Sequence, residues 1–259
     1  MPQPDFLPFI HKLASASGEE ILPFFRNHVQ AENKASGNAF DPVTEGDRAG
    51  EVVMRDMITK AYPEHGIIGE EFGISNPDSD YIWVLDPIDG TRSFIAGVPT
   101  WGTLVGLLHK GKPVAGMMAQ AFTGERFYGD GHSAFSKNNY GTKPLKTREC
   151  TSLGHATLFT TDPRMFKGRE REAYLSIENQ VQLARFSADC YAYCMVAGGF
   201  ADLVIETELK PHDIVALIPI IEGAGGIISS WTGGPATEGG NIIAAGDKRI
   251  HEEALKLFA

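Results

Sequence analysis

The sequence has few cysteines, no long apolar run and no basic segment at its start. Its three cysteines are an odd number without the spacing of a disulfide framework, which points to a reducing compartment. The longest apolar run, Ile214–Ile221, is far shorter than the roughly 20 residues that a membrane span needs, and Met1–Asp5 lacks the basic residues of a signal peptide. We therefore expect a cytoplasmic protein without a role in a membrane.

The sequence also lacks a cluster of lysine and arginine residues. Its net charge is −10, and a nucleic-acid backbone demands a basic face, so we expect no nucleic-acid partner. An acidic protein binds a phosphorylated metabolite only where cations or local basic groups reverse the field at the site. No Gly-x-Ser-x-Gly motif occurs, which argues against a serine hydrolase. Cys190 and Cys194 have no second Cys or His pair at zinc-site spacing, which favours core packing for both.

The most informative feature that is present lies in residues 83–94. Tyr81–Leu85 has the composition of a buried strand, and Pro87, which has no backbone donor, is expected to end its ladder. Asp86 and Asp89 would then emerge where the strand delivers its last side chains. The backbone carbonyl of Ile88 can face the same point, since it lies between the two aspartates.

These groups are all oxygen ligands, which select Mg²⁺, Mn²⁺ or Ca²⁺ rather than zinc. Mg²⁺ is the default in cells, and Mn²⁺ is an alternative. Gly90 allows a close backbone approach, so the amides of Gly90 and Thr91 are candidates for binding an anion. The competing interpretation is structural: Asp86 caps a turn, and Asp89 with Gly90 forms only a turn.

Three further acidic segments support a metal site. Glu70 or Glu71 follows a short apolar strand at residues 66–68 and can reach the same cation. Asp213 precedes a run with apolar residues at helical spacing, and Asp47 opens an amphipathic helix. Taken alone, Asp47 and Asp213 are N-caps of their helices by default.

Taken together, these motifs resemble the inositol monophosphatase superfamily of Mg²⁺-dependent phosphatases. The run at residues 83–91 is similar to its Trp-Val-Ile-Asp-Pro-Ile-Asp-Gly-Thr signature, and residues 213–226 are similar to its second signature. Gly-Glu-Glu at 69–71 and Asp-x-Val-Thr-x-x-Asp at 41–47 fall in the same order and spacing, so the resemblance covers almost the whole chain. One departure is His212, where the family often has Trp, and no role is carried over to it.

The resemblance implies a role for each matched residue. Glu70, Asp86 and the Ile88 carbonyl would bind a first Mg²⁺, and Asp86, Asp89 and Asp213 a second. A third, weaker ion would also use Glu70. Thr91 and Asp47 would orient the attacking water.

The substrate side is expected at residues 185–194. Asp189 stands where inositol phosphatases usually have a small residue, and Glu206 matches a glutamate that binds substrate hydroxyls. An added carboxylate calls for a cationic partner. This segment and residues 91–104 resemble histidinol-phosphate phosphatases of the inositol-monophosphatase type. Asp189 as a helix N-cap is the alternative, and Arg185 either pairs with Asp189 or faces solvent.

The pattern of apolar residues predicts a mixed α/β protein. Helices are expected at residues 5–29, 47–61, 168–180, 189–198, 213–224 and 247–258. Strands are expected at 66–70, 81–86, 102–109, 112–120, 125–128, 156–161, 200–205, 226–230 and 241–245. The resemblance implies a layered αβαβα sandwich and a homodimer. We expect a single domain over residues 1–259, with two intimate halves, about 1–145 and 146–259.

The leading functional hypothesis is a Mg²⁺-dependent phosphomonoesterase that hydrolyses L-histidinol phosphate in histidine biosynthesis. The alternative is an inositol-1-phosphate phosphatase, whose substrate is a neutral polyol phosphate. A third possibility, a catalytically idle scaffold or regulatory protein, predicts the loss of a metal ligand. It is disfavoured because Glu70, Asp86, Asp89 and Asp213 are all present.

Overall fold

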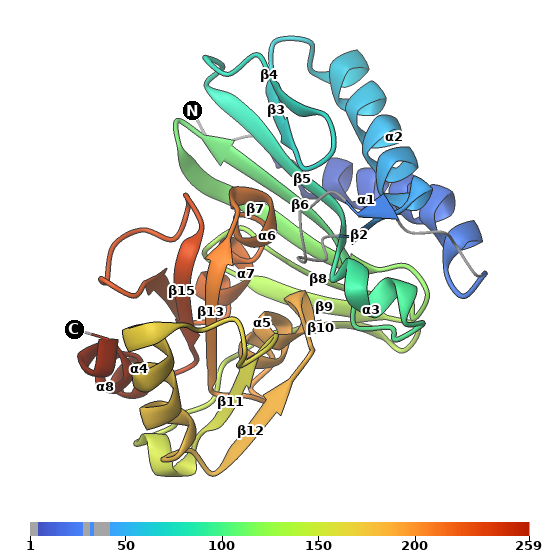
Figure 1. Ribbon diagram of the computed structural model, residues 1–259. Helices are drawn as coiled ribbons and strands as arrows, with labels where there is room; N and C mark the ends of the chain where they lie inside the picture. Colours follow the sequence, from blue (N-terminus) through green and yellow to red (C-terminus); the bar gives the residue numbers. More distant parts are fainter. Residues whose placement is uncertain (1–4, 28–31, 34–41, 259) are drawn as a thin grey trace.

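Two β-sheets with helices between and outside them form the protein (Figure 1). The computed structural model describes residues 5–27, 32–33 and 42–258. No helix within these residues combines the length and the apolar content that crossing a bilayer requires.

The larger sheet has eight strands in the order β10-β9-β8-β7-β6-β5-β3-β4. Only β3 and β5 pair in parallel; the other neighbours are antiparallel. Its strands are β3 (Gly66–Gly69), β4 (Gly73–Ser75), β5 (Tyr81–Asp89), β6 (Gly102–His109), β7 (Lys112–Gln120), β8 (Glu125–Gly129), β9 (Ala134–Asn138) and β10 (Gly141–Pro144). A separate short pair consists of β1 (Glu32–Asn33) and β2 (Pro42–Val43).

The smaller sheet has five strands in the order β12-β11-β13-β15-β14. Strands β12, β11 and β13 run parallel, and β15 pairs antiparallel with both β13 and β14. Its strands are β11 (Thr157–Thr160), β12 (Leu183–Phe186), β13 (Leu203–Leu209), β14 (Ile227–Ser230) and β15 (Gly240–Ala245). The two sheets are thus built from consecutive parts of the chain, which meet between β10 and β11. The division into two halves near residue 145 remains a prediction.

The helices form three layers around the two sheets (Figure 1). The first layer packs on the larger sheet, the second lies between the sheets, and the third covers the outer face of the smaller sheet. The first layer consists of α1 (Leu7–Ile21) and α2 (Glu45–Ala61). The second, between the sheets, consists of α5 (Cys190–Ala197), α6 (Pro211–Ile214) and α7 (Ile218–Gly223). The third consists of α4 (Gly168–Glu178) and α8 (Lys248–Phe258). This arrangement confirms the expected αβαβα sandwich. The short elements η1 (Leu22–Phe24), α3 (Thr91–Ile95) and η2 (Leu153–His155) join the larger ones.

The apolar cores follow these layers. One core lies between the first helix layer and the larger sheet and includes Trp83 and Met54. The central core joins both sheets through α5 and α7, and includes Leu104 and Ile242. Gly116 shows how closely this layer approaches the larger sheet, because a Cβ there would lie 2.0 Å from the carbonyl oxygen of Ala216. The central helix layer therefore packs closely against the larger sheet, which contains β5.

Three expectations about elements were wrong. Pro87 does not end its strand, since β5 continues to Asp89 through a register shift against β6. The helix expected at 213–224 is two short helices, because Pro219 at the start of α7 cannot donate to the preceding turn. The helix expected at 5–29 ends at Ile21 as α1 and is followed only by the short η1; residues 28–29 lie outside the described residues. In addition, the short helix α3 was not predicted.

Candidate active site

The end of β5 brings two aspartates to one side of the sheet. Asp86 pairs with Leu104 and Asp89 with Gly102, so three steps along β5 match two along β6. In a regular strand, residues three apart point to opposite faces. The extra residue of this bulge restores the alternation, which places both carboxylates on the same face. The bulge is held by Thr103, whose hydroxyl donates to the Pro87 carbonyl at 2.8 Å.

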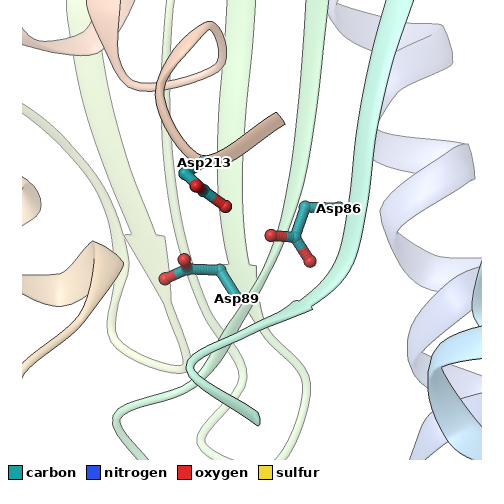
Figure 2. Close-up of side chains that lie close together, drawn as sticks. All are labelled: Asp86, Asp89 and Asp213. Carbon is teal, nitrogen blue, oxygen red and sulfur yellow. The ribbon is translucent and has the colours of Figure 1, made fainter. Parts of the chain in front are cut away.

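Asp213 approaches these two carboxylates from the opposite side. It lies in α6, which packs against β5 and β6, and it accepts the Lys210 amide at 2.6 Å. Asp213 is therefore the third residue of its helix rather than the N-cap, which is Lys210. Figure 2 shows Asp86, Asp89 and Asp213 facing one another, and one carboxylate oxygen of each lies within 4.8 Å of the others. The imidazole Nε2 of His212 lies 3.6 Å from an Asp213 oxygen.

The electrostatics of this triad favour a bound cation. Burial raises the pKa of Asp86 well above its usual range, and Glu70, Asp89 and Asp213 raise it further by repulsion. The pKa of Asp89 is also raised well above normal by burial and by Asp189 and Asp213, and burial raises that of Asp213. A hard divalent cation neutralises the repulsion and restores the ionised forms. The donor set therefore fits Mg²⁺ or Mn²⁺.

Glu70, rather than Glu71, lines the cavity beside the triad. Its amide donates to the Leu85 carbonyl at 3.2 Å, which ties the end of β3 to β5. The buried carboxylate of Glu51 accepts the amide of Glu71 at 2.7 Å and that of Phe72 at 3.2 Å. This anchor fixes the turn that presents Glu70.

Asp47 is buried next to this region but does not line the cavity. Thr44 is the N-cap of α2, and Asp47 is the reciprocal third residue, which accepts the amide and hydroxyl of Thr44 at 2.7 and 2.6 Å. The structural alternative for Asp47, that it is the N-cap of its helix, is therefore wrong, and its catalytic role stays a prediction. The other carboxylate oxygen of Asp47, Oδ1, has no hydrogen-bond partner among the described residues. Burial raises the pKa of Asp47 to about 7. Asp41, in the same motif, lies outside the described residues.

The turn after β5 forms the next wall of the cavity. Gly90 has φ +83°, which a glycine adopts without strain, and it precedes α3. The Thr91 hydroxyl donates to the Ile88 carbonyl at 3.1 Å, and the Ile88 amide donates to Asp86 at 3.0 Å. Ile88, Gly90, Thr91 and Arg92 all line the cavity.

Asp189 also lines the cavity and lies directly against this turn. It precedes α5 at the N-cap position, but its side chain makes no capping hydrogen bond. Instead it accepts the Ser93 hydroxyl at 2.6 Å, and Ser93 in turn accepts the Thr100 hydroxyl at 3.0 Å. A Cβ at Gly90 would lie 2.9 Å from the Asp189 carboxylate. The side chain is therefore directed by α3 rather than used as a helix cap.

Glu206 on β13 is the second carboxylate at this end. It is buried and accepts the amide and hydroxyl of Thr161 at 2.6 and 2.9 Å. Burial raises its pKa to about 8, and the charge of Asp189 contributes to the increase. Burial also raises the pKa of Asp189, while Ser93 and Arg92 oppose that increase.

The structure does not bring Arg185 to this site. It lies exposed on the edge strand β12 and does not line the cavity, and Ser93 is the residue that contacts Asp189. Sequence reasoning also missed part of the lining, although Arg92, Cys190 and Tyr193 lie in segments already noted. The missed lining residues are Arg92, Thr161, Met165, Cys190, Tyr193 and Leu209.

Two sets of carboxylates line one cavity of about 220 Å³: the aspartate triad with Glu70, and Asp189 with Glu206. The two sets adjoin each other, since the charge of Asp189 acts on Asp89. The first set suits hard cations and, through them, a phosphate. The second set suits a cationic or hydroxylated organic group.

Comparison with known proteins gives consistent matches over the whole chain. Residues 3–259 match the inositol monophosphatase family. The bifunctional phosphatase IMPL2 of Arabidopsis thaliana, named as chloroplastic, is 42% identical over an alignment 255 residues long that covers 94% of this chain and 72% of that protein. A histidinol-phosphatase of Streptomyces coelicolor is 31% identical, with 97% of this chain and 96% of that protein covered.

A solved structure agrees with these sequence matches. An inositol monophosphatase from Zymomonas mobilis superposes with a TM-score of 0.86 at 37% identity, covering 98% of this chain and 99% of that one. The similarity therefore extends to the arrangement of all the layers.

Proposed function

The chain belongs to the inositol monophosphatase family, and on that premise we propose that it is a Mg²⁺-dependent phosphomonoesterase that hydrolyses L-histidinol phosphate. The observation that carries the proposal is a second pair of carboxylates, Asp189 and Glu206, in the same cavity as the aspartate triad. A substrate with a phosphate at one end and an ammonium group at the other matches both sets.

At the phosphate end, we assign the metal ligands to Glu70, Asp86, Asp89, Asp213 and the Ile88 carbonyl, for two or three ions. Divalent ions bound there would neutralise the phosphate dianion and lower the pKa of a bound water. The close oxygens and raised pKa values of the triad support this assignment.

The protein's own groups would position the attacking water and the phosphate. Thr91 donates its hydroxyl proton to Ile88, which leaves its oxygen lone pairs to accept a hydrogen bond from water. Asp47 has an unpartnered Oδ1 and is the proposed second acceptor in this arrangement. The amides of Gly90 and Thr91 are proposed to contact the phosphate.

At the other end, Asp189 and Glu206 would bind the ammonium group of histidinol phosphate. Glu206, with a pKa of about 8, is protonated at neutral pH in the protein alone. An ammonium group nearby favours its ionised form, so the pair becomes complementary when this cation binds. Three relatives named histidinol-phosphatase, at 31–33% identity, support this choice of substrate.

Inositol 1-phosphate is the second candidate substrate. Relatives named inositol 1-monophosphatase reach 34% identity, and a polyol can donate hydroxyl hydrogen bonds to the same two carboxylates. It would bring no cationic group to these carboxylates, whereas histidinol phosphate brings an ammonium group, which favours histidinol phosphate. A catalytically idle scaffold remains the least favoured proposal, because the acidic cluster is intact.

The deciding experiment is a steady-state comparison of histidinol phosphate, inositol 1-phosphate and an adenosine bisphosphate at saturating Mg²⁺. We expect the highest kcat/KM for histidinol phosphate, by about 10-fold or more. Equal or faster turnover of inositol 1-phosphate would overturn the substrate assignment. Absence of hydrolysis with all three would instead favour the scaffold.

Two further expectations accompany this proposal. A homodimer is predicted from the resemblance, and light scattering of the purified protein measures it directly. A cytoplasmic location is predicted from the composition, although similar proteins include ones named as chloroplastic.

A further inference from the structure

Tyr193 presents an unpartnered hydroxyl group in the wall of the cavity. It lies on α5, is 3% exposed and lines the cavity. Its hydroxyl has no hydrogen-bond partner among the described residues. A buried polar group without a partner is costly, so it calls for an explanation.

The hydroxyl groups of two other tyrosines differ from that of Tyr193 in their partners or their location. Tyr191, on the same helix, donates its hydroxyl to Glu125 at 3.0 Å. Tyr174 also has a buried hydroxyl without a partner, but it packs in the outer core, 4.2 Å from the Phe166 ring centroid, and does not line the cavity. Only Tyr193 combines the unpartnered hydroxyl with a place in the cavity wall, as far as the described residues show.

Tyr193 is influenced by both carboxylate sets of the cavity. The charge of Glu206 acts on its hydroxyl from the substrate side, and those of Asp89 and Asp213 from the triad. Burial and these charges raise its pKa well above normal, so the hydroxyl stays protonated and can donate. In a substrate that both carboxylate sets bind, the acceptor between the phosphorus and the organic group is the ester oxygen.

We propose that Tyr193 contacts the substrate and donates a hydrogen bond to the ester oxygen of the phosphate monoester, on the leaving-group side. The inference rests on the proposed phosphatase function but not on which alkyl phosphate is preferred. Water forms the new bond to phosphorus, the bond from phosphorus to the ester oxygen breaks, and its electron pair stays on that oxygen. A water proton completes the alcohol product. Tyr193 keeps its own proton and stabilises the charge that develops on the leaving oxygen.

The test is Tyr193→Phe, with Tyr174→Phe as the matched control. Both variants lose a buried hydroxyl that has no protein partner, so neither should lower the Tm. We expect Tyr193→Phe to lower kcat about 10- to 100-fold on an alkyl phosphate. The reference alkyl ester is the fastest of histidinol phosphate, inositol 1-phosphate and glycerol 2-phosphate. Tyr174→Phe should keep normal kinetics.

The dependence on the leaving group separates this role from a structural one. With p-nitrophenyl phosphate, whose leaving oxygen is stable without a donor, the loss in kcat should be under about 3-fold. An equal loss on both esters, a change in KM alone, or normal kinetics would overturn the proposal. If inositol 1-phosphate is preferred, the substrate assignment fails, but the kinetics of Tyr193→Phe still test the proposed hydrogen bond to the ester oxygen. If the wild type hydrolyses no ester, both proposals fail.

Discussion

Asp89→Asn tests the metal site through stability as well as activity. Asparagine keeps the shape of Asp89 and can still accept the Cys190 amide, which the carboxylate accepts at 2.8 Å. What it removes is one ionisable carboxylate from the triad, whose oxygens lie within 4.8 Å of one another. At that separation two unit charges repel by about 3.5 kcal/mol at an effective dielectric constant of about 20. The variant without metal should therefore be as stable as the wild type or more stable.

The response to Mg²⁺ should change in the opposite direction. At 100 times its Kd, a ligand that binds only the folded state stabilises it by about 2.7 kcal/mol. For a chain of this length that corresponds to a Tm increase of about 5–11 °C. We expect the wild type to show this increase and Asp89→Asn to lose most of it. Turnover should fall about 10²- to 10³-fold or more, the loss typical for one stabiliser of a transition state.

Thermal unfolding and turnover, each measured over a Mg²⁺ titration, give the two readouts. The matched control is Asp202→Asn, because Asp202 is also buried but pairs with Arg148, and it does not line the cavity. This control should lower the Tm at every Mg²⁺ concentration and retain the Mg²⁺-dependent increase. A normal Mg²⁺ response together with near-normal turnover in Asp89→Asn would refute the metal assignment.

Three further changes test other parts of the site. Asp189→Asn should lower kcat/KM about 10- to 150-fold for histidinol phosphate in steady-state assays, with inositol 1-phosphate hardly affected; equal small effects would favour a polyol phosphatase. Thr91→Ala should lower kcat more than it raises KM, and loss of affinity alone would make Thr91 a phosphate-binding residue. Glu206, with its pKa raised to about 8 by burial, holds a proton that the unfolded chain releases. Stability of the metal-free protein should therefore fall as pH rises from about 4.5 to 8, and thermal melts of Glu206→Gln should lack that decrease.

Much of the fold follows from local patterns. The strands β6 and β7 have the predicted bounds because their alternating or continuous apolar residues are interrupted by a clear turn at residues 110–111. Strand β12 was missed because it lies at an exposed edge, where burial imposes no apolar pattern. The order of strands in each sheet also required the structure, since it depends on contacts between distant residues.

The candidate site, like the fold, could be predicted only in part from the sequence. Asp86, Asp89, Asp213 and Glu70 could be predicted together from motif order, and the structure places all four around one cavity. The bulge that brings Asp86 and Asp89 to one face could not be predicted, because it depends on the pairing with β6. Ser93 and Tyr193 were missed for a related reason: their importance depends on partners, or on the lack of a partner, far away in the sequence.

Several independent features converge on Asp189, and a helix cap would require none of them. Its backbone has φ 46° and ψ −136°, a conformation that costs a non-glycine residue about 1–3 kcal/mol. Gly90 must lack a side chain for the carboxylate to fit, and Ser93 must donate to hold it in place. Asparagine or serine caps a helix in ordinary geometry, without this strain. The strain at Asp189 is therefore better explained by a ligand that its carboxylate binds, as the proposed cationic substrate requires.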